Sequence, residues 1–177
     1  MGTSTQSEEV ANRRPEPGTA LNLGCGRKRR EGALNLDRVP ELNPDVTHDL
    51  DKIPWPLADN QFGEVYAEDV LAHCTDVIAT MEEIHRVCQD HAIVRITTPH
   101  FSSANSFVDP THLQHFSYFS FDYFTDNHEF GFYSKKRFRR HRAQIVFLPT
   151  LANKLVWRLA NRYPAAYERR WAWLFPA

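Results

Sequence analysis

The sequence predicts an α/β fold built around a mostly parallel sheet. Short apolar runs recur through the first hundred residues, and a segment of helical period separates the last two of them. Because a strand, a helix and a second strand in succession form a parallel pair, this order indicates a parallel sheet. The length of 177 residues suits one domain with one sizeable core, which we place at residues 19–177.

The first strand is predicted at Ala20–Leu23, where an apolar run breaks off into a glycine-rich turn. The residues before it, 1–18, are polar, contain Pro15 and Pro17, and lack large apolar residues at either period. Such a segment cannot bury enough apolar surface to offset the cost of ordering. We therefore expect a disordered N-terminal arm.

Two further short strands are expected at Ala33–Leu36 and Val46–His48, and each is followed by a carboxylate, Asp37 or Asp49. The carboxyl ends of neighbouring parallel strands face the same crevice, where open α/β sheets bind ligands. Asp is also common in ordinary turns, so a structural role for either residue stays open.

The last two strands of the predicted sheet are Phe62–Ala67 and Ala92–Thr97. Between them Asp76 can cap a helix, in which Ile78, Met81, Ile84 and Cys88 recur at helical spacing.

The second half of the chain has a less regular pattern. Residues 100–133 are aromatic and rich in His and Ser, which predicts an ordered loop with short helices, and long loops of this kind are usually functional. Phe132–Leu148 is expected to form a strand pair or one long strand. A helix follows, with Leu151, Leu155, Val156 and Leu159 on one face.

The charge is balanced overall but unevenly distributed. Residues 131–177 contain eleven Lys and Arg residues and one acid, Glu168. The run 135–142 suits a charged edge strand, and an anionic substrate or partner is the alternative. We expect the tail aromatics to pack against the sheet or a second subunit, so a homodimer is possible. No apolar run approaches the roughly 20 residues that span a bilayer.

The three cysteines, Cys25, Cys74 and Cys88, have no metal-like spacing and are odd in number. Together with the lack of a charged-then-apolar leader, this predicts a cytoplasmic protein.

The turn Gly24-Cys25-Gly26 lets the backbone approach a ligand closely. The dinucleotide fingerprint is incomplete, because Arg29 occupies the third glycine position and Asp37 follows Gly26 too soon. Carboxylates at two strand ends suit ribose hydroxyls and the amino edge of adenine. The predicted ligand is therefore a nucleoside.

An ordered series of motifs over residues 20 to 124 resembles the class I S-adenosylmethionine-dependent methyltransferases, in their type 11-like subgroup. It comprises Leu21–Gly26, Asn35–Asp37, His48–Leu50, Ile53–Pro56, Asp59–Phe62, Val70–His73, Glu83–Val87 and Asp109–His112. The resemblance implies a Rossmann-like sheet with flanking helices, a short or missing helix between the first two strands, and S-adenosyl-L-methionine as cofactor.

The resemblance also assigns cofactor-binding roles: the backbone of Gly24, Cys25 and Gly26 to the methionine part, Asn22 to its ammonium, Asp37 to the ribose, Asp49 with the Leu50 amide to adenine, and Glu68 to the lining of the pocket. The chain departs from the family where Asn22 replaces an acid and Lys28 replaces a third glycine. Lys28 would place a cation near a sulfonium.

His112, His100 and Asp109 are the candidate catalytic residues. Two imidazoles and a carboxylate could form a proton-abstracting base or a metal site, and ordinary loop hydrogen bonding is the third possibility. We interpret His112 as a general base oriented by Asp109 and assign no metal.

These observations predict a methyltransferase that O-methylates a small polar acceptor such as a sugar. A non-catalytic cofactor-fold scaffold is the first alternative, favoured by Lys28 and Asn22. A nucleic-acid methyltransferase is less favoured, because the chain lacks an Asn-Pro-Pro-Tyr-like motif after the fourth strand.

Overall fold

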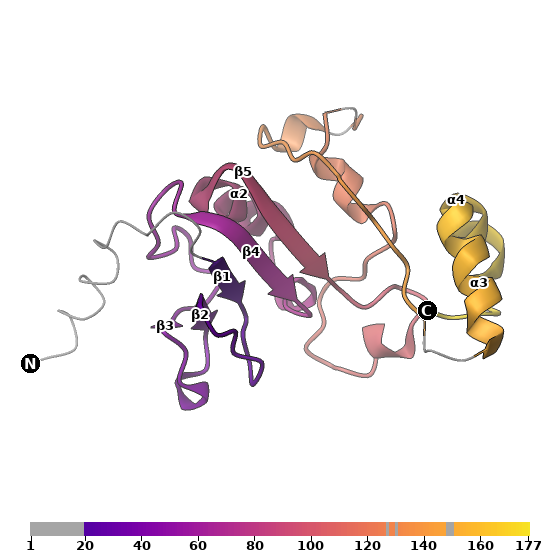
Figure 1. Ribbon diagram of the computed structural model, residues 1–177, viewed down its shortest axis with the longest axis horizontal. Coiled ribbons are helices and arrows are strands. Elements are labelled where there is room, and N and C mark those ends of the chain that lie inside the picture. The colour runs from indigo at the N-terminus through magenta and orange to yellow at the C-terminus, as the bar shows by residue number, and fades with distance from the viewer. Residues whose placement is uncertain (1–19, 127, 130, 148–150) are drawn as a thin grey trace, which may run out of the picture. The chain divides into compact units, whose positions relative to one another are not determined.

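The computed structural model describes residues 20–126, 128–129, 131–147 and 151–177 (Figure 1). The predicted arm, residues 1–18, lies outside the described residues. The chain divides into two compact units, residues 1–98 and 99–177, between Thr98 and Pro99. The assignment of residues 19–177 to one domain stays a prediction.

The first unit is a five-stranded parallel sheet of order β3-β2-β1-β4-β5. Its strands are β1 (Ala20–Leu23), β2 (Ala33–Asp37), β3 (Val46–Thr47), β4 (Phe62–Glu68) and β5 (Cys88–Thr97). This confirms the α/β prediction. Residues 24–32 contain no helix, as expected between the first two strands.

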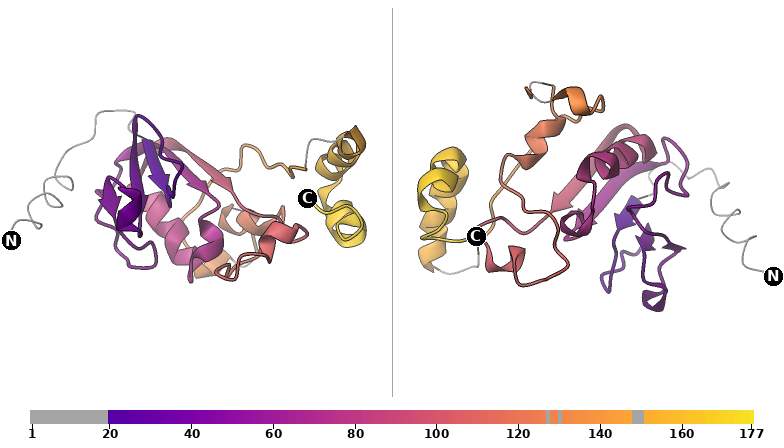
Figure 2. Two further views of the ribbon diagram at one scale, coloured as in Figure 1. Left: turned by 90° about the horizontal axis from the view of Figure 1, so that it is seen from below. Right: turned by 180° about the vertical axis from the view of Figure 1, so that it is seen from behind.

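One face of the sheet is apolar and packs beside helix α2 (Val77–Val87). Leu23 of β1 lies in register with Leu36 of β2 and Ala67 of β4, and all three are fully buried. Asp76 caps α2 by accepting a bond from the Ala79 amide, as predicted. Figures 1 and 2 show α2 running along one side of β4 and β5.

The opposite face of the sheet is polar. Asn22 of β1 lies in register with Asn35 of β2 and with Tyr66 of β4, and side chains of alternate residues share a face. The Asn22 amide donates to Asn35 Oδ1 at 3.0 Å, and the Arg30 guanidinium stacks over the Tyr66 ring at 3.7 Å. The polar side chains of this face therefore contact one another across neighbouring strands.

Short 3₁₀ helices complete the first unit: η1 (Pro40–Leu42) and η2 (Leu71–His73). Strand β5 begins four residues earlier than expected, so Cys88 is a strand residue that ends α2 rather than part of its apolar face.

The second unit is largely irregular up to residue 147. It contains the predicted short helices, η3 (Ala104–Ser106), η4 (Ser120–Phe124) and η5 (Gly131–Tyr133). The predicted helix is α3 (Leu151–Arg162), followed by α4 (Pro164–Ala166) and a π-helical turn, η6 (Tyr167–Trp171). A core of Ile145, Phe147, Ala160, Tyr167 and Ala172 joins these elements.

The strand predicted at Phe132–Leu148 is wrong over its described part. Phe132 and Tyr133 belong to η5, residues 134–147 form no strand, and Leu148 lies outside the described residues. Side chains replace the missing ladder: Asn161 Oδ1 accepts from the Ile145 amide and Asn161 Nδ2 donates to the Ile145 carbonyl, both at 2.8 Å. The basic run is accordingly an extended segment and no edge strand.

None of the helices in the described ranges has the length and apolar character needed to cross a membrane.

Candidate functional site

The turn after β1 contains two glycines, Gly24 and Gly26, and their surroundings differ. Gly24 has φ +57°, and a Cβ there would lie 2.2 Å from Val70 Cγ2, so the packing of Val70 requires glycine. Gly26 has φ +50°, and a Cβ there would meet nothing closer than the Gly24 carbonyl oxygen at 4.0 Å. The space beside Gly26 is therefore open to a ligand.

Asp37 joins the glycine turn to the end of β2. Its Oδ2 accepts from the Gly26 amide at 2.8 Å and its Oδ1 from the Val39 amide at 2.9 Å. An ionised carboxylate oxygen accepts two bonds, so each oxygen retains acceptor capacity. Only 7% of Asp37 is exposed, which fixes the carboxylate beside the open space at Gly26.

Asp49 and Leu50 follow β3 on a loop that a tryptophan holds in place. The Leu50 carbonyl accepts from Trp55 Nε1 at 3.0 Å, while the Trp55 amide donates to Glu83 Oε2 at 2.8 Å. The candidate adenine loop is thereby tied to α2. An open hollow lies along it, lined by residues that include Arg38, Thr47, His48, Asp49 and Lys52.

Glu83 and Arg86 anchor this tether from α2. Arg86 donates to both Glu83 oxygens, to Asp59 and to the carbonyls of Trp55 and Leu57. Burial favours the neutral carboxyl of Glu83, but the bonds from Arg86 and Trp55 outweigh it and lower the pKa of Glu83. The i,i+3 spacing could have predicted the Glu83–Arg86 pair, but not its partners on the loop.

Asn22 and Glu68, two predicted cofactor-binding residues, have local partners. The buried Asn22 amide donates to the Lys28 carbonyl at 3.0 Å as well as to Asn35, so it holds the glycine loop. Glu68 forms an ion pair with Arg30, the residue stacked on Tyr66. Their roles toward a cofactor stay predictions.

Two cations of the glycine loop, Lys28 and Arg29, are paired with acids next to neighbouring strands. Lys28 lies 3.7 Å from Asp69, and Arg29 lies 2.6 Å from Asp45. The positive charge expected near the sulfonium is therefore matched by an acid beside it, although both members of the Lys28 pair are exposed and bind weakly.

The cysteines of the first unit are buried thiols. Burial raises the pKa values of Cys74 and Cys88 to about 11. Burial, with a contribution from the Asp37 charge, also raises the pKa of Cys25. Since the thiolate is the nucleophile, none of the three suits covalent chemistry at neutral pH.

His100 lies in the second unit, with partners at both ring nitrogens. Its Nδ1 accepts from the Ser102 amide at 3.2 Å, so the proton resides on Nε2, which donates to Glu168 Oε1 at 3.0 Å. Glu168 also accepts from the Tyr118 amide at 2.6 Å. These bonds join the loop to η6, so the geometry favours a structural role over catalysis for His100.

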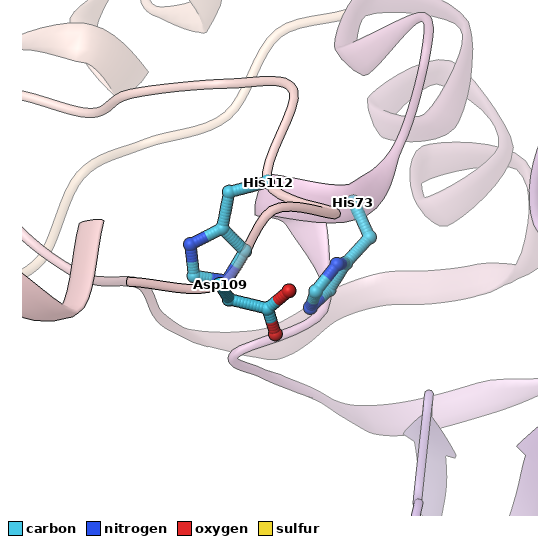
Figure 3. Close-up of side chains that lie close together, drawn as sticks. All are labelled: His73, Asp109 and His112. Carbon is cyan, nitrogen blue, oxygen red and sulfur yellow. The ribbon is translucent and has the colours of Figure 1, made fainter. Parts of the chain in front are cut away.

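Asp109 and His112 are brought together by the second unit (Figure 3). A carboxylate oxygen of Asp109 and a ring nitrogen of His112 lie within 4.8 Å of each other. Asp109 Oδ1 accepts from the amide and hydroxyl of Thr111, which shapes the turn. His112 Nδ1 lies 3.3 Å from the Ser106 carbonyl; donation there leaves the lone pair on Nε2, the tautomer that a base requires.

Comparison with known proteins identifies one sequence family. Residues 21–96 match the family described as "Methyltransferase domain". No curated protein matches the chain.

Solved structures similar to the chain include the YcgJ protein of Bacillus subtilis, with 14% identity, 63% and 60% of the two chains covered and a TM-score of 0.43. A putative S-adenosylmethionine-dependent methyltransferase of Methanococcus maripaludis has 20% identity, 52% and 53% coverage and a TM-score of 0.38. One from Aquifex aeolicus has 18% identity, 62% and 72% coverage and a TM-score of 0.44. The chain spans less than two thirds of the first two.

Proposed function

We propose that the chain is an S-adenosylmethionine-dependent methyltransferase that O-methylates a small polar acceptor such as a sugar, and the match of residues 21–96 to the methyltransferase domain family supports this proposal. The observation that carries the proposal is the Asp37 carboxylate bonded to the Gly26 amide at 2.8 Å, beside open space. This arrangement places an anion with unused acceptor capacity next to a backbone that a ligand can approach.

The residues present fit the cofactor at three points. Asp37 would hold the ribose hydroxyls, the turn at Gly26 would border the methionine part, and Asp49 with the Leu50 amide would hold adenine. The Trp55 tether keeps the last of these loops in position. When bound, the cofactor supplies a reactive methyl group, so the protein mainly orients the acceptor and removes its proton.

His112 is the residue that we assign to proton removal. Its Nδ1 faces the Ser106 carbonyl, so Nε2 has the lone pair that can accept a proton from an acceptor hydroxyl. Asp109, close to the ring, would stabilise the imidazolium that forms.

The cofactor assignment is tested by titrating the chain with S-adenosylhomocysteine in a calorimeter. We expect Asp37→Asn to weaken binding by about tenfold or more, because a charge-assisted bond to ribose is lost while one acceptor oxygen remains. Asp90→Asn, an exposed acid of β5, is the matched control and should bind like the wild type. If the wild type binds nothing at millimolar ligand, the proposal is wrong.

The base assignment is tested by His112→Ala in a labelled-methyl assay against sugars and other polar metabolites. Turnover should fall by roughly a hundredfold while cofactor affinity stays within about twofold, because the ring acts in the transition state alone. His141→Ala, an exposed histidine of the basic segment, is the control. Full turnover in His112→Ala, or loss of activity on chelation with recovery on adding a divalent metal, contradicts the base assignment.

A non-catalytic scaffold is the second candidate function, and the local pairing of Asn22 and Glu68 favours it. Under that alternative the chain would bind S-adenosylhomocysteine weakly or not at all, so the same titration separates the two.

A further inference from the structure

The C-terminal region, residues 151–177, exposes large apolar side chains that a folded domain normally buries. Leu155 is 63% exposed on α3, and Trp173 and Leu174 near the end of the chain are 73% and 72% exposed. Among residues 153–177, the exposed large apolar residues are Leu155, Trp157, Leu159, Tyr163, Trp171, Trp173, Leu174 and Phe175. Exposure of this many large apolar side chains within one short region indicates an interaction surface.

Helix α3 has two apolar sides, of which one is packed against the core and the other is exposed. Val156 and Ala160 pack against the core of the second unit. Leu155 and Leu159 lie four residues apart on α3, and Tyr163 follows four residues later, just past the end of the helix, with its amide bonded to the Leu159 carbonyl. These three side chains form a separate stripe, and this stripe is exposed. The second stripe has no role in the fold that the structure describes.

Cations accompany the exposed apolar residues. Lys154, Arg158, Arg169 and Arg170 are exposed and form no ion pair within the described part of the chain. Glu168 is the one acid of residues 131–177, and it is largely buried against His100 and the Tyr118 amide. The outward charge of this region is therefore positive throughout.

We propose that residues 151–175 bind the surface of an anionic phospholipid membrane. An amphipathic helix with exposed Leu, Trp, Lys and Arg binds in the plane of the membrane–water interface. Its apolar side chains insert between the headgroups and the acyl chains, and its cations contact anionic headgroups. Trp and Tyr favour this boundary because their rings have an apolar body and a polar edge.

Two other occupants fit the surface less well. A second copy would bring the five cations of residues 151–175 toward five others with one acid on each side, and like charges repel. A nucleic acid would match the charge and the aromatic rings, but it offers no apolar phase for Leu155, Leu159 and Leu174.

The proposal that residues 151–175 bind a membrane does not depend on the proposed enzymatic function, and its test needs no methyl acceptor. The full chain is mixed with vesicles of phosphatidylcholine alone or with about 30% phosphatidylglycerol, and binding is measured by co-sedimentation. We expect binding to the anionic vesicles, little to the neutral ones, and weakening as salt rises. Tryptophan emission should shift to the blue, because three of the four tryptophans are exposed here while Trp55 is buried.

The apolar contribution is tested by the triple variant L155S/L159S/L174S, and the charge contribution by K154Q/R158Q/R170Q. Each should lower the partition coefficient by about tenfold or more. The control V108S/I93S removes two exposed apolar residues elsewhere, 70% and 52% exposed, and should bind like the wild type. Since every substituted side chain is exposed, far-UV circular dichroism should show unchanged folding.

Four results would overturn the proposal: no binding to anionic vesicles, equal binding to neutral and anionic vesicles, equal loss in the control, or a dimer in sedimentation equilibrium that L155S/L159S/L174S abolishes. Binding of single-stranded RNA without binding of anionic vesicles would likewise assign the surface to nucleic acid.

Discussion

The two compact units of the chain use their charged residues differently. Residues 20–98 contain fourteen acids and eight Lys or Arg residues, and five of those cations form ion pairs. Residues 99–177 contain five acids and eleven Lys or Arg residues, and Arg140 of this unit pairs with Asp122. Paired charge in the first unit joins its loops and strands, whereas in the second unit Lys154, Arg158, Arg169 and Arg170 lie exposed at the surface.

The units also differ in how their backbones are satisfied. The first has a parallel ladder with an apolar face, so its strands hold one another. In the second, side chains such as Asn161 and Glu168 bond the backbone directly. Substituting one polar side chain should therefore lower the unfolding free energy in both units. In the first unit the loss comes from ion pairs between loops and α2, and in the second from side-chain bonds to the backbone.

The largest effect is expected from breaking the Arg86 network of the first unit. Arg86→Leu leaves the Glu83 carboxylate, whose side chain is 9% exposed, without its cation. We expect a loss of about 3–5 kcal/mol of unfolding free energy, measured by urea denaturation with circular dichroism. Arg140→Leu, whose pair with Asp122 is more exposed, is the comparison and should cost about 1 kcal/mol. Similar losses in both would remove the difference between the units.

Much of the first unit could be predicted from the sequence because its pattern is local. Buried strands such as Ala20–Leu23 are short apolar runs ended by turn residues, and Asp76 is an N-cap residue that indicates the start of α2. Asp37 could be placed beside the glycine turn because neighbouring parallel strands end at the same edge of the sheet. The boundary at Cys88 was missed because the helix passes directly into β5, and an apolar residue suits either element.

The second unit was harder to predict because its contacts join distant residues. Nothing in the pattern of residues 134–147 reveals that Asn161 would replace a strand partner for Ile145. The aromatic and β-branched residues there, Phe138, Ile145, Val146 and Phe147, suit a strand, and only the tertiary contacts decide otherwise. The partnership of His100 with Glu168, 68 residues away, likewise has no local signal.

A smaller effect is expected from Asn161, which tests whether side chains hold the second unit. Asn161→Ala removes the two bonds to Ile145 and the bond to the Trp157 carbonyl, and it leaves the Ile145 backbone groups without these partners. We expect a loss of about 1–3 kcal/mol of unfolding free energy. Asn161→Asp keeps an acceptor for the Ile145 amide but no donor, so it should fall between the two. A variant as stable as the wild type would show that the apolar core alone holds the segment.

The smallest effect concerns the link between the fold of the first unit and its candidate site. Trp55→Phe keeps a smaller aromatic ring at this buried position and removes the Nε1 donor to the Leu50 carbonyl. If the tether from α2 positions the adenine loop, S-adenosylhomocysteine affinity should fall by about three- to tenfold, since one neutral hydrogen bond contributes about 1 kcal/mol. Isothermal titration measures the change, and Trp157→Phe, an exposed tryptophan of the second unit, is the control. Lower stability with unchanged affinity would mean that the Trp55 bond maintains the first unit without serving the site, because the loss would then be equal in the free and bound states.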